Sequence, residues 1–327
     1  MPGIKNLVIF TATKVMIDFI FPKTGESLAE NNGKLITPSG KEVPVVRDIP
    51  RFVPQDNYAS AFGLQWKAFR LTQLDSANQS NVSLERLERC LGATISSLKS
   101  KSVLEVGCGA GRFTELLVKS GAQVHSVDLS VAVEANKENI GNVSNYRIAQ
   151  ASVYELPFPD NAFDVVFCLG VIQHTPSSEK TIESLWKKVK PGGLLIIDHY
   201  RWRLSYYSTL KPLYRHYLKR LAPEISKRKV DKLVDFFFPL HWKYKNNKIV
   251  WWLIHRVSPL IEYIHEFPEW SFEEQFELSR LDSYDSLTDY YKHLRTPSQI
   301  RSQLIKLGGK NIWIEKGGNG VEARAIK

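Results

Sequence analysis

Cysteine is scarce in this sequence of 327 residues, and the three that occur, Cys90, Cys108 and Cys168, lie far apart. An odd number at such spacings predicts neither a disulfide framework nor a zinc site. Repeats and low-complexity tracts are also missing, so the composition is that of an ordinary globular protein. We therefore expect a protein of a reducing compartment, with Cys108 and Cys168 as small buried residues.

Long apolar runs are absent as well. The most apolar stretch near the start, residues 6–21, contains Lys14 and Asp18 and is shorter than a bilayer span requires. The first residues lack the basic segment and the cleavage site of a secretory leader. We expect a buried strand or helix here and a cytoplasmic protein, with contact to a membrane surface as the lesser alternative.

The positive charge is concentrated in one segment. The chain has a net charge of +10, and between Arg201 and Ser258 there are 14 Lys and Arg against three acidic residues, a surplus of 11. Aromatic residues share the segment. Four interpretations remain open: the solvated face of a helical lid, or a surface for a phosphate-bearing acceptor, an anionic membrane, or RNA.

Short apolar runs alternate with helical stretches from residue 101 onward, as in a parallel sheet covered on both faces. The pattern predicts strands over 102–107, 123–130, 146–152, 163–170 and 194–200, with helices over 112–121, 131–139 and 179–190. Pro191-Gly192-Gly193 is expected to stop the third helix. After a long interruption the pattern predicts a helix over 296–309 and an antiparallel hairpin over 311–327.

The predicted organisation is therefore a core interrupted by two additions. Residues 99–200 and 296–327 form the core, 1–98 an N-terminal hairpin and helical cap, and 201–295 a basic, aromatic helical insertion over the active site. Ser83 is a candidate N-cap within the helical part of the cap. In the insertion, Leu210, Leu213, Tyr214 and Tyr217 share one helical face, which favours a role in the insertion's own core.

Three glycines, Gly107, Gly109 and Gly111, follow the first predicted strand of the core, in the stretch VLEVGCGAGRFTE. Their spacing differs from the G-x-G-x-x-G of dinucleotide-binding folds. Glu105 precedes them and would repel a pyrophosphate, yet it would attract an ammonium group. Asp128 ends the next strand, where a carboxylate can accept from ribose hydroxyls. Such a set fits S-adenosylmethionine better than NAD.

These residues, together with VHSVDLS and SVYELPFPDNAFDVVFCLGVIQHTP, closely resemble successive motifs of the class I S-adenosylmethionine-dependent methyltransferases, in the subgroup with an LPF-x-D-x-x-FD-x-V signature. The resemblance covers about 101–200 and 296–327. It implies an α/β, Rossmann-like, seven-stranded sheet and S-adenosylmethionine as cofactor. The cofactor-binding residues that it implies are Glu105, Gly107, Gly109, Gly111, Asp128, Leu129, Ser152, Val153 and Leu169.

The resemblance implies that these residues bind different parts of the cofactor. Glu105 and the glycine loop would hold the methionine part, Asp128 the ribose and Leu129 the adenine. Ser152 stands where the family usually has an acid, so the adenine amino group would be left to the Ser152 hydroxyl and the Val153 backbone.

Methyl transfer needs alignment first and a base second, and a hydroxyl acceptor of high pKa requires the base. His174 and His199 are the candidate bases, although His174 is equally well explained as a structural residue. On the substrate side we place Gln65, Trp66, Tyr200, Asp282 and Asp285. Asp289 and His293 lie in the same stretch as the last two acids, whose spacing gives no reason to assign metal ligands.

The sequence thus predicts a methyltransferase that modifies an oxygen of a small-molecule, glycan or lipid-linked acceptor. C-methylation of an isoprenoid quinone is an alternative, because the LPFPD stretch resembles those enzymes too. RNA methylation through the basic segment is a further one, favoured if the positive groups form one stripe leading to the cofactor. A binding module without activity would require a blocked acceptor channel. The oligomeric state is left open.

Overall fold

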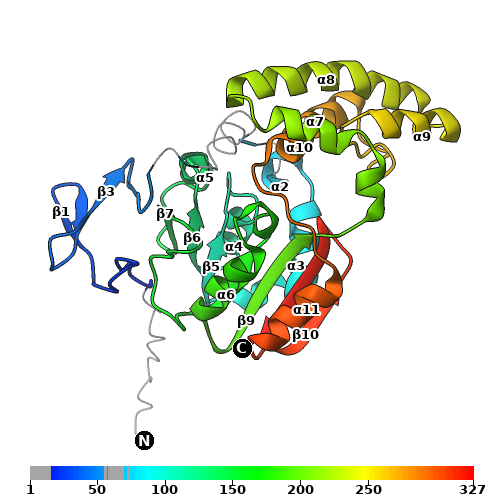
Figure 1. Ribbon diagram of the computed structural model, residues 1–327. Coiled ribbons are helices and arrows are strands. Elements are labelled where there is room, and N and C mark those ends of the chain that lie inside the picture. Colours follow the sequence, from blue (N-terminus) through cyan, green and yellow to red (C-terminus); the bar gives the residue numbers. More distant parts are fainter. Residues whose placement is uncertain (1–15, 55–56, 58–69, 72–73) are drawn as a thin grey trace, which may run out of the picture.

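The computed structural model describes residues 16–54, 57, 70–71 and 74–327, and its centre is a seven-stranded sheet (Figure 1). The strand order is β10-β11-β9-β8-β5-β6-β7, with β5 to β9 parallel and β11 antiparallel to β9. This is the predicted Rossmann-like arrangement closed by a reversed hairpin. The strands are β5 (Ser102–Val106), β6 (Gln123–Asp128), β7 (Tyr146–Gln150), β8 (Phe163–Cys168), β9 (Val189–Tyr200), β10 (Lys310–Glu315) and β11 (Gly320–Ile326).

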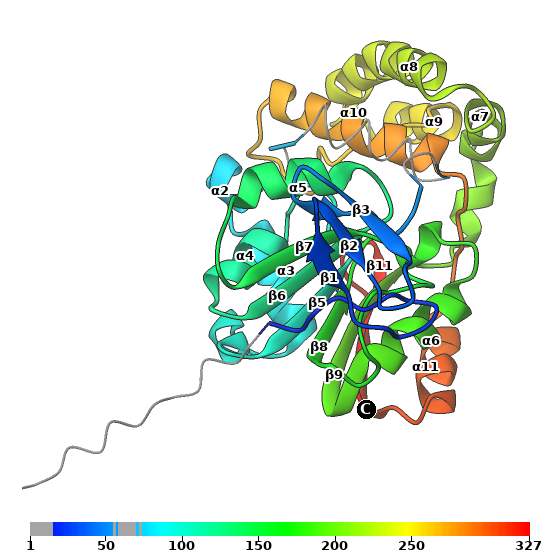
Figure 2. The same ribbon diagram turned by 90° about the vertical axis from the view of Figure 1, so that its left-hand side faces the viewer.

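Helices cover both faces of this sheet, because its parallel strands are apolar on both sides. On one face lie α3 (Val82–Leu91), α4 (Thr114–Lys119) and α5 (Ala132–Ile140), and on the other α6 (Ser178–Lys188) and α11 (Pro297–Lys306) (Figure 2). Each face has its own buried cluster, one around Leu87 and Phe167, the other around Phe158 and Leu185. The predicted α/β, Rossmann-like, seven-stranded fold is confirmed.

One boundary was predicted wrongly. The sequence Pro191-Gly192-Gly193 does not separate a helix from a strand, because α6 ends at Lys188 and β9 already begins at Val189. The pairing of β8 with β9 shifts register between Phe163 and Val165. Gly192 has a φ of +78° and donates its N–H to the Lys327 carbonyl, so this irregular start of β9 is held in the sheet by the end of the chain.

The start of α3 also differs from the prediction. Asn81 is the N-cap residue and Ser83 lies within the helix. The Asp75 carboxylate, from the short helix α2 (Asp75–Asn78), accepts the N–H groups of Ser83 and Leu84 at 3.1 Å and 2.9 Å. An acid from a preceding segment therefore takes the capping role predicted for Ser83. A 3-10 turn, η1 (Ile95–Leu98), follows α3.

A small antiparallel sheet precedes the core and lies beside β7, at the blue end of the chain (Figure 1). Its strands are β1 (Ala29–Asn31), β2 (Lys34–Ile36), β3 (Glu42–Val46) and β4 (Ile49–Pro50). The Phe52 N–H donates to the Gln150 carbonyl at 2.8 Å, so this sheet covers the open edge at β7. The predictions for residues 6–15 and for most of the following helical stretch, including Gln65 and Trp66, lie outside the described residues.

The insertion is helical, as predicted, and lies above the carboxyl ends of the parallel strands (Figures 1 and 2). It consists of η3 (Leu204–Ser208), α7 (Lys211–Leu218), α8 (Pro223–Tyr244), α9 (Lys248–Val257) and α10 (Phe272–Thr288). Its buried cluster includes Val234, Phe238 and Leu287. The expected contribution from α7 is wrong in part, because Leu213 is 67% exposed and Tyr217 53%.

None of the helices in the described part of the chain combines the length and the apolar character that crossing a membrane requires.

Candidate active site

The glycine loop after β5 has a backbone shape that other residues would not adopt. Gly107 has a φ of +78° and donates its N–H to the Val127 carbonyl at 2.7 Å. A Cβ at this position would lie 2.0 Å from the Val171 Cγ2 atom. Gly109 has a φ of +50° and donates its N–H to the Asp128 carboxylate at 3.0 Å. The loop is therefore joined to the end of β6 and has no room for side chains at Gly107.

A cavity of about 870 Å³ opens over this loop, between the carboxyl ends of the strands and the insertion. In open parallel sheets this edge is where ligands bind. The cavity brings together most of the residues predicted from the sequence: Gly107, Gly109, Asp128, Leu129, Val153, Leu169, His174, Tyr200, Asp282 and Asp285.

Four predicted residues are not on the cavity wall. Gly111 packs against Asn136 behind the loop. The Ser152 hydroxyl accepts the Tyr154 N–H, so the wall beside it is formed by Val153. Glu105 and His199 are buried and bonded elsewhere, as described below. Because Ser152 does not line the cavity, this structure does not support the predicted hydrogen bond between its hydroxyl and the adenine amino group.

Comparison with known proteins places the core in a family. Residues 104–197 match the model described as "Methyltransferase domain". The part of the chain that matches contains the glycine loop, Asp128 and the LPFPD stretch. The core of this chain is a class I S-adenosylmethionine-dependent methyltransferase domain.

Two curated relatives illustrate the extent of the similarity to other methyltransferases. Phosphoethanolamine N-methyltransferase 2 of Caenorhabditis elegans is 36% identical over 106 residues, which are 31% of this chain and 24% of the relative. A ubiquinone biosynthesis O-methyltransferase of Azoarcus sp. (strain BH72) is 30% identical over 125 residues, 37% of this chain and 49% of the relative. The chain thus spans about a quarter to a half of the length of these relatives.

Among solved structures, this chain is similar to a SAM dependent methyltransferase from Aquifex aeolicus, at 15% identity and with a TM-score of 0.43. That match covers 83% of this chain and 98% of the solved one.

The residues of the methyltransferase domain fit S-adenosylmethionine, the cofactor of the family. Gly107 and Gly109 allow close approach of the methionine part to the backbone. The Asp128 Oδ1 atom accepts from the Ser130 N–H and hydroxyl, whereas Oδ2 accepts the Gly109 N–H. A carboxylate oxygen can take a second donor, so Oδ2 can hold a ribose hydroxyl. Leu129, Val153 and Leu169 form apolar parts of the cavity wall, where Leu129 would lie against the adenine.

Replacing Asp128 by alanine should lower the affinity for S-adenosylmethionine by about 100-fold, because charge-assisted hydrogen bonds to the ribose are lost. Isothermal titration calorimetry on the purified protein measures this. Asp160→Ala, an exposed acid paired with Lys188 in the same domain, is the matched control and should bind as the wild type does. Unchanged affinity in Asp128→Ala would remove the ribose assignment.

Glu105 lies beneath the glycine loop and not on the cavity wall. Its Oε2 atom accepts the hydroxyls of Thr114 and Ser126 at 2.6 Å and 2.8 Å, and the residue is 3% exposed. Burial raises the pKa of this carboxyl to about 7, and the two hydroxyl donors only partly offset the burial. The side chain therefore supports the loop from below, which differs from the predicted contact with the ammonium group.

Glu105→Gln should become more stable relative to the wild type as the pH rises from about 4.5 to 7. The folded wild type holds a proton in this interval that the unfolded chain releases, so its stability falls as the pH rises, whereas glutamine does not titrate. We expect a relative gain on the order of 3 kcal/mol in urea denaturation, levelling off above pH 7. A difference that is constant with pH would contradict the buried, protonated carboxyl.

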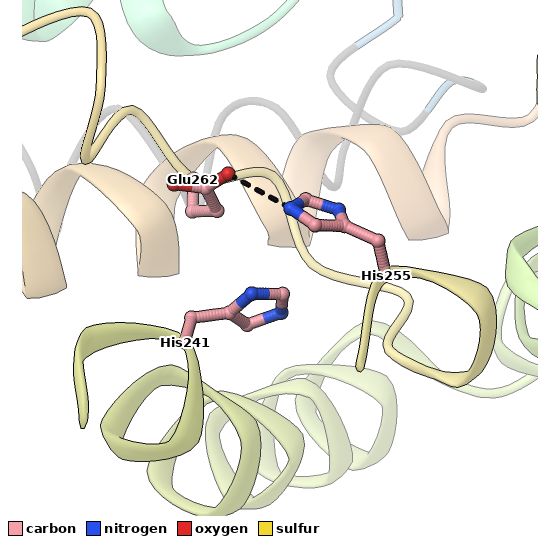
Figure 3. A group of neighbouring side chains, drawn as sticks. All are labelled: His241, His255 and Glu262. Carbon is pink, nitrogen blue, oxygen red and sulfur yellow. Dashed lines mark ion pairs between the residues drawn. The ribbon is translucent and has the colours of Figure 1, made fainter. Parts of the chain in front are cut away.

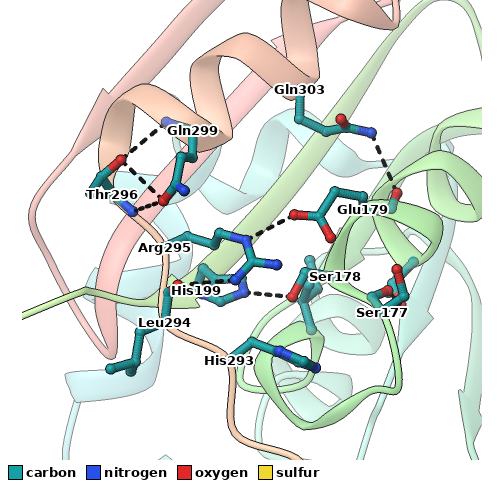
Figure 4. Close-up of polar contacts among 12 residues, drawn as sticks. Ser177, Ser178, Glu179, His199, His293, Leu294, Arg295, Thr296, Gln299 and Gln303 are labelled. Atoms are coloured by element: carbon teal, nitrogen blue, oxygen red, sulfur yellow. Dashed lines mark hydrogen bonds and ion pairs between the residues drawn. The ribbon is translucent and has the colours of Figure 1, made fainter.

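His199, the second candidate base, is a structural residue. It is 1% exposed at the end of β9, and its Nε2 atom pairs with the Ser178 hydroxyl at 2.9 Å, while Nδ1 donates to the Tyr200 carbonyl (Figure 4). Burial lowers its pKa to about 4. The surrounding contacts, including the ion pair of Arg295 with Glu179 in Figure 4, join the end of the insertion to α6. The prediction of a catalytic role for His199 is corrected.

His174, unlike His199, lies on the wall of the cavity. It ends η2 (Ile172–His174), lines the cavity and lies edge-on to the Tyr200 ring. Its Nδ1 atom is 3.2 Å from the Asp289 Oδ2 atom and 3.3 Å from the Tyr291 carbonyl. Two acceptors at Nδ1 place the proton there and leave Nε2 as the basic nitrogen of the ring.

Asp289 remains charged although its side chain is fully buried. Burial acts to raise its pKa, but the charge of Lys292, the His174 bond and Arg215 together hold the pKa below its usual range. Arg215 Nε donates to Oδ1 at 2.6 Å, and Lys292 Nζ lies 2.8 Å from Oδ2. The carboxylate is therefore an ionised partner for the histidine.

The rest of the acceptor side contains charged groups that sequence reasoning missed. Lys211 and Lys292 line the cavity, and burial next to Lys292 lowers the pKa of Lys211 to about 7. Asp282 accepts the Tyr263 hydroxyl, and burial raises its pKa to about 6. The lysines lie in ordinary helical and loop sequence, so no local signal distinguishes them from solvent-exposed lysines.

Proposed function

We propose that this protein transfers a methyl group from S-adenosylmethionine to an oxygen of a small or glycan-type acceptor. The observation that carries the proposal is the His174–Asp289 pair on the wall of the cavity that also contains the glycine loop and Asp128. A base oriented by a buried carboxylate suits a hydroxyl acceptor, whose proton must be removed during methyl transfer.

The cofactor, when bound, would supply an electrophilic methyl group on a sulfonium, whose methyl–sulfur bond would break to leave a neutral thioether. His174 takes the proton of the acceptor hydroxyl at Nε2 as the oxygen becomes bonded to the methyl carbon. Asp289 holds the Nδ1–H and stabilises the imidazolium that results, in the manner of other histidine–carboxylate pairs. Lys292 and Arg215 keep Asp289 ionised throughout. The insertion lies over the cavity (Figure 1), and a site with little water would favour the dispersed charge of the transition state.

The acceptor end of the cavity suits a molecule with several hydroxyl groups. Asp282 and Asp285 supply carboxylates, and the Asp285 Oδ1 atom is buried with no hydrogen-bond partner among the described residues. Tyr263, Phe267 and Trp270 give aromatic surfaces in the same wall. Carboxylates that accept from hydroxyls beside aromatic faces are a common way to hold a sugar-like ring.

The surface beside the cavity mouth supports a lipid-linked acceptor and peripheral contact with a membrane. Arg203 lines the cavity, and next to it Leu204 is 71% and Tyr207 59% exposed. The Ser208 carbonyl accepts from Arg256 of α9, whose outer face exposes Trp252 and Leu253 by about half. Exposed apolar residues among basic ones suit an anionic lipid surface. The three cysteines are free and buried, which supports a cytoplasmic location.

The test is an incubation of the pure protein with methyl-labelled S-adenosylmethionine and cell extract separated into aqueous, lipid and RNA fractions. We expect base-stable label, as in a methyl ether, in the aqueous glycan or the lipid fraction, and no transfer by Asp128→Ala. Label on a carbon of a quinone would favour C-methylation, the reaction type in the name of one relative, sterol 24-C-methyltransferase ERG6B of Gibberella zeae. Label in RNA, or in no fraction, would contradict the proposal.

A further inference from the structure

Two histidines and a glutamate converge inside the insertion, away from the catalytic cavity (Figure 3). His241 belongs to α8, His255 to α9, and Glu262 to the segment that leads toward α10. One donor atom from each lies within 4.8 Å of the other two. His241 is fully buried, and the Glu262 side chain is 5% exposed. None of the three lines the cavity, although Ile261 and Tyr263, on either side of Glu262, do.

His241 presents a donor atom that the described protein does not use. Its Nε2 atom pairs with the Ser258 hydroxyl at 2.9 Å, whereas Nδ1 is buried and has no hydrogen-bond partner among the described residues. With the proton on Nε2, Nδ1 offers a bare lone pair. A buried polar atom left without a partner destabilises the fold, so its retention calls for a ligand.

Glu262 and His255 are already placed as a pair. The Glu262 Oε1 atom lies 3.1 Å from His255 Nε2, and Oε2 accepts the Ile264 N–H at 2.9 Å. The backbone bond to Oε2 leaves Oε1 directed at the histidine, as outer contacts do for metal-binding carboxylates.

We propose that His241 Nδ1, His255 Nε2 and Glu262 Oε1 bind a divalent cation of the zinc class. Two imidazole nitrogens and one carboxylate oxygen are a donor set that zinc takes with bonds of about 2.0–2.2 Å, a water completing the tetrahedron. Such bonds place neighbouring donors roughly 3.3 Å apart. The distance of 3.1 Å between His255 Nε2 and Glu262 Oε1 already meets this, and the His241 donor atom, within 4.8 Å of both, would have to move toward them when the ion binds.

The ion joins three elements of the insertion and neutralises Glu262. Because Ile261 and Tyr263 belong to the cavity wall, binding stiffens the wall on the acceptor side without taking part in methyl transfer. The inference is independent of the proposed function, since it rests on side chains outside the cavity.

The test uses the full chain, freed of any histidine tag and treated with a chelator, and zinc competition against a chromophoric chelator. We expect one zinc ion per wild-type chain and at least a tenfold weaker affinity in both His255→Gln and Glu262→Gln. His216→Gln is the matched control, because His216 is an exposed histidine of α7 that pairs with Arg220, and it should bind as the wild type does. Cobalt in place of zinc should give the visible absorption of a tetrahedral site in the wild type and in His216→Gln, and should not give it in His255→Gln or Glu262→Gln.

Several results would overturn the site. A wild-type chain that binds no stoichiometric zinc excludes it, and so do His255→Gln and Glu262→Gln variants that bind zinc as tightly as the wild type. If Glu262→Gln does not fold, as seen by circular dichroism, the partly exposed His255→Gln gives the same comparison. Zinc should also raise the thermal midpoint of the wild type and leave that of folded His255→Gln unchanged.

Discussion

Substituting His174 by glutamine should lower methyl transfer to a hydroxyl acceptor by about 100- to 10,000-fold, the range expected for loss of a general base. Glutamine keeps a hydrogen-bond donor for Asp289 but has no nitrogen that takes a proton. The affinity for S-adenosylmethionine should change by less than about twofold, because the cofactor residues belong to the glycine loop and to Asp128. Single-turnover transfer of label to the responsive fraction, together with calorimetry, separates the two effects.

The matched control for this substitution is His199→Gln, which changes the other histidine that the sequence proposed as a base. Its ring bonds to Ser178 and to the Tyr200 carbonyl, so the variant should lose stability and keep its rate per folded molecule. If His174→Gln transfers methyl within threefold of the wild-type rate, the base assignment is wrong. If His199→Gln loses turnover at full stability, the two roles are reversed.

Substituting Arg86 by methionine should reduce the free energy of unfolding by about 3–5 kcal/mol, the range for removing one partner from a buried charge network. The Arg86 guanidinium, on α3, contacts Asp198 of β9 at 2.5 Å and Glu322 of β11 at 3.0 Å. Both carboxylate side chains are fully buried, and burial already raises the pKa of Asp198 despite the arginine. Methionine fills similar space but leaves two acids without their shared cation.

The same network offers a graded comparison, since Arg89 also binds Glu322 but is 44% exposed. Arg89→Met should therefore cause a clearly smaller loss than Arg86→Met. Urea denaturation followed by circular dichroism measures both. Equal losses, or an Arg86→Met variant within 1 kcal/mol of the wild type, would show that the buried pair is not essential for holding α3 against the sheet.

The core could be predicted from the sequence because its signals are local. A strand buried on both faces is a continuous apolar run, and the turn after β5 needs glycine where φ is positive and Val171 is in contact. The boundary at Pro191-Gly192-Gly193 was missed for the same reason. Proline and glycine suggest that an element ends there. The segment nevertheless stays in the sheet, because it pairs with β8 and donates a hydrogen bond to the Lys327 carbonyl, and both partners lie elsewhere in the sequence.

Side-chain direction at the strand ends could not be predicted in this way. His199 and Tyr200 are neighbours at the end of β9, yet Tyr200 lines the cavity and His199 bonds to α6. Alternation along a strand sends them to opposite faces, and the sequence does not say which face the insertion covers. Glu105 likewise turned away from the cavity, because the Thr114 and Ser126 hydroxyls lie beneath the loop.

The sequence by itself determined the sheet, the glycine turn and the carboxylate at the end of β6, since each depends on backbone conformation set within a few residues. Only the tertiary structure decided that Asp289 partners His174 and that His241, His255 and Glu262 meet. These pairings depend on how the insertion folds back over the sheet. A buried charge or lone pair interacts with the groups that lie close to it in space, and the spacing of residues along the chain does not predict which groups those are.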